Sequence, residues 1–165
     1  RTFTRISKIN KIMALDLKVT SNVKKVQARY VKFLNRFPRI IQQGLDQAGE
    51  QLKTIIIKRT ESGKDQDGKK FIAYSSSYAE LKGKTKVDLE DTNKMLQSIS
   101  SKVVSRNKAQ VFFRSQREAT KGLFHQMGMG NLPKRKFFGF NKKTEKVIQR
   151  TYENFLKKEI RRLGI

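Results

Sequence analysis

The chain has 165 residues, of which 36% are hydrophobic and none is Cys. This length suits one domain with a small core, and the lack of Cys excludes disulfides and thiolate metal sites. No apolar run approaches the ~18 residues that a membrane-spanning helix needs. The net charge is +24, because 38 Lys and Arg residues face 14 Asp and Glu residues. Such an excess has two interpretations. The basic residues contact nucleic acid or an acidic neighbouring subunit, or they form a solvated Lys-rich surface.

The N-terminal part of the chain divides into a basic arm and a predicted strand. Residues 1–12 contain four basic residues and no acidic one, and their weak patterning predicts an arm. In residues 13–20, large apolar side chains alternate strictly with smaller or polar ones. A period of two predicts a half-buried β-strand. Residues 13–165 are therefore expected to form a single domain that follows the arm.

The next part of the chain has helical periodicity. Apolar residues recur at spacings of three and four from Val23 to Phe37, and again from Ile41 to Ile55. Each series places one apolar stripe on a helix. Pro38 stands between the two series; it disfavours helix at the preceding residue and suits the first turn of a new helix. The pattern predicts two consecutive helices, or one kinked helix, over roughly residues 22–60.

The remainder alternates loops with shorter elements. Charged stretches that contain Gly predict loops at residues 61–73 and 82–90, and two β-rich runs at residues 99–105 and 109–114 predict a hairpin. Four further helices are expected, at residues 75–81, 92–99, 116–127 and 143–163. Strands that are grouped around helices, without βαβ alternation, indicate an α+β class. The predicted fold is thus α+β, with a small antiparallel β-sheet packed against long α-helices, extended loops and a basic N-terminal arm.

Residues that could support catalysis or bind a metal are sparse. The chain has one His and no recognisable catalytic or phosphate-binding motif. Residues 65–68 (DQDG) are similar to part of a calcium loop, but the first and twelfth positions of that loop lack the carboxylates it requires. The three carboxylates of residues 88–91 suit an acidic helix start better than a magnesium site. We therefore predict no enzymatic activity, no metal and no cofactor.

Two segments carry motifs whose order and spacing are informative. Residues 62–99 contain a DG-x-x-F turn and, after a Lys-rich stretch, an L-x-x-T-x-x-ML-x-SI run; residues 125–140 contain HQ-x-G and P-x-R-x-FFG. Together these motifs resemble the phage virion morphogenesis, or tail-completion, family of tailed bacteriophages. The family has Gly after the Thr, where this chain has Asn93. Because Asn tolerates the left-handed conformation better than most residues, the turn is expected to survive. The residues that carry the resemblance are Asp67, Gly68, Phe71, Leu89, Thr92, Met95, Leu96, Ser98, Ile99, His125, Gln126, Gly128, Pro133, Arg135, Phe137, Phe138 and Gly139.

The resemblance implies a structural virion protein that assembles in the host cytoplasm and forms a ring at the head–tail junction. It favours a hexamer and allows a dodecamer, as a tail-completion, tail-terminator or neck protein. The implied partners are copies of itself, neighbouring neck or connector proteins and tail tube proteins. Non-specific contact with phage DNA is expected from the basic charge, and no contact with a membrane is expected, because no apolar run is long enough to span one. The alternative, drawn from the charge, is a basic module that binds DNA or RNA phosphates without sequence specificity.

Candidate interface residues lie in the second motif segment. For Phe137 we favour the chain's own core, and for Phe138 a neighbouring subunit, because a short loop is not expected to bury both rings. Arg135 is expected to pair with a carboxylate of a neighbour. Hydrogen bonds from His125 and Gln126 to loop carbonyls are favoured over catalysis. The candidate subunit-interface residues are His125, Gln126, Pro133, Arg135, Phe137 and Phe138.

The two charged loops supply a second candidate surface. In a ring, they are expected to project into the lumen or toward the next ring. Their contact with DNA would then be directed at phosphates and independent of sequence. The residues expected to face DNA or an acidic partner are Lys64, Lys69, Lys70, Lys82, Lys84 and Lys86.

Overall fold

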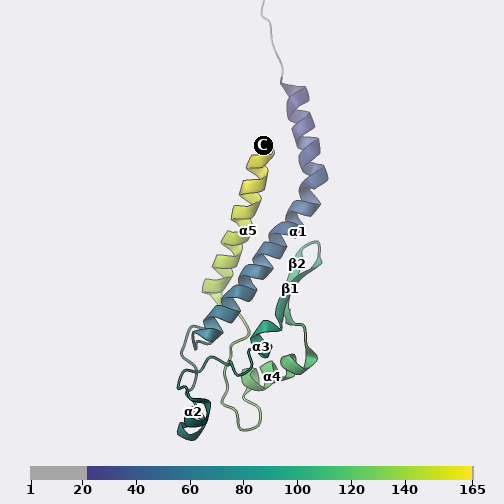
Figure 1. Ribbon diagram of the computed structural model, residues 1–165. Helices are drawn as coiled ribbons and strands as arrows, with labels where there is room; N and C mark the ends of the chain where they lie inside the picture. The colour runs from purple at the N-terminus through teal and green to yellow at the C-terminus, as the bar shows by residue number, and fades with distance from the viewer. Residues whose placement is uncertain (1–21, 165) are drawn as a thin grey trace, which may run out of the picture.

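The protein has an α+β fold, in which two long helices accompany a small antiparallel sheet (Figure 1). The computed structural model describes residues 22–164. The predicted basic arm and the predicted strand at residues 13–20 lie outside the described residues. In chain order the elements are α1 (Val23–Glu61), α2 (Ser76–Lys82), α3 (Lys94–Gln97), β1 (Ile99–Ser105), β2 (Lys108–Phe113), α4 (Gln116–Met127) and α5 (Lys142–Arg162).

Helix α1 is one continuous helix of 39 residues that contains Pro38. Phe37 and Ile41 are four residues apart, so the two apolar series share one helix face and the register continues through the proline. The C-terminal half of α1 packs antiparallel to α5. A Cβ on Gly44 would lie only 2.8 Å from the ring of Tyr152, so glycine allows the two helices to approach closely at this point.

The hairpin packs on the other side of the same half of α1. Strands β1 and β2 pair antiparallel, with Ile99 opposite Phe113, and the register shifts between Val103 and Ser105. Gly49 of α1 brings the helix backbone against Ser101 of β1. The second strand begins at Lys108, one residue earlier than predicted, because this residue pairs with Ser105 instead of forming part of the turn.

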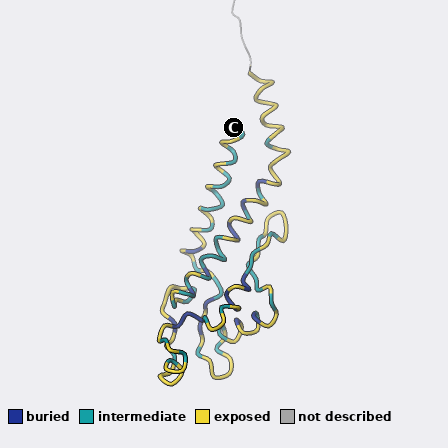
Figure 2. The backbone as a smooth tube through the Cα atoms, viewed as in Figure 1, coloured by how far each residue is buried: buried dark blue, intermediate teal, exposed yellow. Residues whose placement is uncertain are grey.

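The core lies at the C-terminal end of α1, where the loops, α3 and the hairpin meet. Figure 2 shows that buried positions concentrate there, whereas most of the N-terminal half of α1 is exposed. The motif residues Phe71, Leu89 and Phe137 belong to this core. The full cluster of buried hydrophobic residues is Ile56, Phe71, Val87, Leu89, Met95, Leu96, Ile99 and Phe137.

Helix α2 begins and ends at identifiable capping residues. Ser75 accepts a hydrogen bond from the backbone N–H of Tyr78 at the start of α2, and Gly83 ends that helix in the left-handed conformation. The helix predicted at residues 92–99 is shorter than expected, since α3 begins only at Lys94. Its first turn contains no acidic residue, so the expectation that residues 88–91 form an acidic helix start was wrong.

Candidate functional site

The two motif segments, far apart in sequence, lie side by side at the end of α1. The backbone N–H of Gln66 donates to the carbonyl of Lys136 at 2.8 Å. The guanidinium of Arg135 donates twice to the carbonyl of Ile72, at 3.0 and 3.3 Å. Together with the C-terminal end of α1, helix α3, the hairpin and helix α4, these two segments form one unit. We call this unit the motif body.

Arg59, near the C-terminus of α1, connects the two segments. One of its terminal nitrogens donates to the carbonyls of Phe137 and Gly139, at 2.8 and 2.7 Å, and the other to Gln66 at 3.3 Å. Burial lowers the pKa of Arg59, with Asp65 and Asp67 acting in the opposite direction. Arg59 was not predicted from the sequence, because nothing in the local sequence distinguishes it from neighbouring basic residues such as Lys58.

The FFG motif supplies the centre of the motif body. Phe137 is completely buried, as predicted, and its ring meets Phe113 edge to face at 6.4 Å. Phe138 is half-buried and lies 4.9 Å from the same ring. The side-chain amide of Gln126 fixes its backbone, accepting from the N–H at 3.0 Å and donating to the carbonyl at 3.1 Å. Both rings therefore pack within the chain, and only the exposed part of Phe138 is available to a neighbouring subunit.

Arg135 is enclosed by its own chain, with 3% of its surface exposed. Its guanidinium lies 5.2 Å from the ring centre of Tyr74 while it donates to Ile72. Burial lowers the pKa of Arg135. The expected pairing with a neighbour's carboxylate would require the guanidinium to leave this position. Pro133, by contrast, remains partly exposed beside it.

His125 lies at a hollow of about 380 Å³ that Tyr74, Tyr78 and Arg135 also line. Its carbonyl accepts from the backbone N–H of Arg135 at 2.8 Å. Its buried Nδ1 has no hydrogen-bond partner among the described residues, so the predicted side-chain bond to a loop carbonyl is made by Gln126 and not by this atom. Burial, with Arg135 and Lys82 nearby, lowers the pKa of His125 and favours the neutral ring.

Two of the six candidate lysines are paired inside the chain. Lys84 lies 2.7 Å and Lys82 3.7 Å from the carboxylate of the buried Asp88. Burial raises the pKa of Asp88, but hydrogen bonds from Lys84 and from the backbone N–H of Glu90 outweigh it, and the net pKa is lowered. This carboxylate therefore fixes the second loop. The four lysines that remain exposed are Lys64, Lys69, Lys70 and Lys86.

The DQDG sequence forms a closed turn. The side chain of Asp65 accepts from the backbone N–H groups of Asp67 and Lys69, at 2.9 and 2.8 Å, and Gly68 adopts a φ of 84°. These bonds use the carboxylate as a turn-closing group. Among residues 22–164, no group of three or more His, Asp or Glu side chains is placed to hold a metal ion.

One face of the motif body exposes apolar side chains. It combines the outer side of α4 with the loop that follows it, and a hollow of about 450 Å³ lies between α4 and Tyr78. An exposed apolar area of this kind marks an interaction surface. We call it the α4 face, and its exposed residues are Leu123, Phe124, Met127, Met129 and Leu132.

Comparison with known proteins identifies the family. The model of the phage virion morphogenesis family matches residues 21–157, which is most of the chain. The chain belongs to this family. Neither the comparison with curated proteins nor that with solved structures finds a match.

Family membership fits the roles of the motif residues in the fold. Asn93, where the family pattern has Gly, adopts a φ of 60°, which confirms that the left-handed turn survives the replacement. A Cβ on Gly128 would lie 2.9 Å from the backbone nitrogen of Lys134, so the HQ-x-G glycine also allows a close approach. Within residues 22–164, no helix combines the length and apolarity that a membrane span requires.

Proposed function

We propose that the chain is a structural virion component that forms a ring at the head–tail junction, where it completes the tail and takes part in joining it to the head. Membership of the virion morphogenesis family supports this role. The observation that carries it further is the α4 face, where Leu123, Phe124 and Met127 stay exposed on a helix whose opposite side is packed. A face of this kind is suited to contact with a protein partner.

A ring requires each copy to present two different surfaces, because a head-to-tail contact joins unlike patches. The α4 face supplies one of them. The exposed parts of Pro133 and Phe138 lie in the same motif segment and extend the candidate contact. Six copies are favoured and twelve are allowed, with neck or connector proteins on one side of the ring and tail tube proteins on the other.

Genetic disruption tests this function directly. A phage in which this gene is disrupted is expected to accumulate filled heads and separate tails, and purified protein added to that lysate should join them. Electron microscopy counts the joined particles. A lysate with normal joined particles, or one in which added protein joins nothing, would contradict the proposal.

Contact with DNA is a second element of the proposal. The exposed residues Lys64, Lys69, Lys70 and Lys86 lie on the loops of the motif body, and phosphate contacts of this kind weaken steeply with salt. Fluorescence anisotropy with a random-sequence duplex should show binding that falls as salt rises. Binding that is insensitive to salt would contradict phosphate contact, and binding to one sequence alone would contradict its non-specific character.

A further inference from the structure

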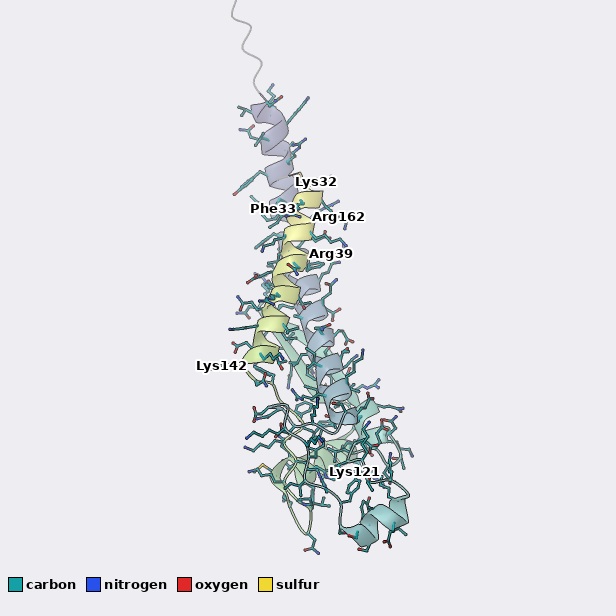
Figure 3. All side chains as sticks on the ribbon, turned by 90° about the vertical axis from the view of Figure 1, so that its left-hand side faces the viewer. Lys32, Phe33, Arg39, Lys121, Lys142 and Arg162 are labelled. Atoms are coloured by element: carbon teal, nitrogen blue, oxygen red, sulfur yellow. The ribbon has the colours of Figure 1, made fainter. Side chains whose placement is uncertain are left out.

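Helix α1 continues past the end of its partner helix. The guanidinium of Arg29 donates to the carbonyl of Gly164, just beyond α5, at 3.3 Å. In Figure 3, the N-terminal part of α1 rises beyond the end of α5. Even beside the last turns of α5, residues such as Leu34 remain exposed. Among residues 22–164, little therefore covers the first half of α1, residues 23–41, which we call the upper half.

An apolar stripe runs along this half of the helix. Val26, Tyr30, Leu34 and Phe37 have exposed fractions of 58%, 55%, 54% and 41%. Their spacings of four, four and three place them on one face. The ring of Phe33 adds to the stripe, since it lies 5.2 Å from that of Phe37. Large aromatic and aliphatic side chains that remain this exposed contribute to stability only when a partner covers them.

The stripe continues the face that binds a helix lower down. Following the same register, α1 presents Gly44 and Ala48, and both are buried. Tyr152 and Phe155 of α5 lie directly against Gly44. Because helix α5 packs on this face in the lower half of α1, a helix is also the kind of element that fits the face in the upper half.

Charge on this half of α1 decides what kind of partner fits. No acidic residue precedes Asp46 in the helix, and Lys25, Lys32, Arg36 and Arg39 share the side away from the stripe. Arg29 lies beside the stripe, but its guanidinium donates to the carbonyl of Gly164 in its own chain. A partner can therefore bury the stripe without burying these charges. A contact selected for acidic partners would instead need basic residues beside the apolar seam, as in charge-paired helix seams.

We propose that the stripe of Val26, Tyr30, Leu34 and Phe37 is a contact between copies of this chain, in which the upper half of α1 packs on a helix of the next copy. The inference rests on the proposed ring, in which copies of this chain contact one another. It adds a second surface, distinct from the α4 face, as a head-to-tail contact requires. The basic side of α1 then faces outward from the packed helices.

The lack of Cys makes a direct test possible, because one introduced thiol is the only one in the chain. Leu34→Cys places it on the stripe, and Arg36→Cys places the matched control on the opposite side of the same helix. Maleimide alkylation is followed while the protein concentration is raised. The thiol at position 34 should react about tenfold more slowly at high concentration, by mass action, whereas that at position 36 should not change. Equal rates at all concentrations, or protection of position 36 alone, would overturn the inference.

A substitution pair gives an independent readout. Tyr30→Gln/Leu34→Gln keeps good helix formers and should leave the circular dichroism unchanged while the molar mass in solution falls. Leu81→Gln is the control, because Leu81 is 84% exposed on α2, away from the stripe. A double variant with unchanged mass would contradict the inference.

Vesicle binding and complementation of the disrupted phage distinguish contact between copies from lipid binding, and test the contact separately from the proposed function. If vesicles of phosphatidylcholine and phosphatidylglycerol protect the thiol at position 34 where the protein is monomeric, the stripe binds lipid and the inference fails. If Tyr30→Gln/Leu34→Gln joins heads and tails normally in the disrupted phage, the stripe is not the contact, although the proposed function stands. If self-contact is seen but the disrupted phage joins normally, the proposed function fails and the contact remains.

Discussion

The motif body and the upper half of α1 differ in the burial of their apolar and basic side chains. In the motif body, Phe137 is completely buried, and Arg59 and Arg135 direct their guanidinium groups to backbone carbonyls. In the upper half of α1, Tyr30 and Leu34 are more than half exposed. The difference shows that the motif residues Phe137 and Arg135 maintain the fold, whereas large exposed apolar side chains such as Tyr30 and Leu34 lie outside the motifs.

The largest expected contrast is in stability. Phe137→Ala should lower the free energy of unfolding by about 3–5 kcal/mol, because it empties a site at the centre of the core. Tyr30→Gln should change it by less than about 0.5 kcal/mol, since the ring is exposed in the single chain. Urea unfolding at a concentration that keeps both variants monomeric measures the two values. If both substitutions lower the free energy of unfolding equally, the two regions do not differ in their contribution to stability.

The two regions should also differ in what an arginine contributes. Arg59→Gln removes charged hydrogen bonds to Phe137, Gly139 and Gln66, and should cost about 2–3 kcal/mol of unfolding free energy. Arg36→Gln, on exposed helix, should cost less than about 0.5 kcal/mol. Arg59→Lys should recover little of the free energy of unfolding that Arg59→Gln loses, because one ammonium lacks the planar guanidinium that reaches several carbonyls. Full stability of Arg59→Lys would show that charge alone is needed.

A smaller effect tests the departure from the family pattern. Asn93→Ala should cost about 1 kcal/mol, because Ala is disfavoured at a φ of 60°, whereas Asn93→Gly should be neutral or slightly stabilising. Chemical denaturation of the original chain and the two variants gives the order of their unfolding free energies. If Ala and Gly are equivalent, the left-handed turn before α3 is not maintained in solution.

The smallest effect is confined to mildly acid solution. Because the pKa of His125 is lowered in the fold, the unfolded chain binds its proton first as the pH falls below about 6.5. Stability is therefore complete above that pH and decreases below it. His125→Asn should flatten the curve between about pH 6.5 and pH 5, before Asp88 contributes a loss of the same sign. An unchanged slope in the variant would assign the pH dependence to other groups.

Local patterns in the sequence predicted most elements. The hairpin, the helix that ends at Gly128 and the burial of Phe137 follow from periodicity, capping residues and the motif. The sequence left open whether one helix or two span Pro38, and the structure shows a single helix that contains it. Such signals are local, which is why they can be read without a structure.

Features that depend on contacts between distant segments were not predictable. Arg59 meets Phe137 across 78 positions of sequence, and no nearby residue indicates that contact. Lys82 and Lys84 were expected to face a partner, but Asp88 holds both through a loop geometry that composition does not encode. Likewise, the exposure of Leu34 depends on how distant segments pack around α1, which its apolar spacing cannot reveal.

Light scattering behind a sizing column tests the central claim most directly. The intact chain should have the mass of a defined ring of six or twelve copies, and Tyr30→Gln/Leu34→Gln should fall to a smaller species with unchanged unfolding free energy. Nuclease treatment should leave the mass of the intact chain unchanged. A monomer at every salt and protein concentration, or a large species that nuclease reduces to monomer, would contradict the account and favour a nucleic-acid-binding module.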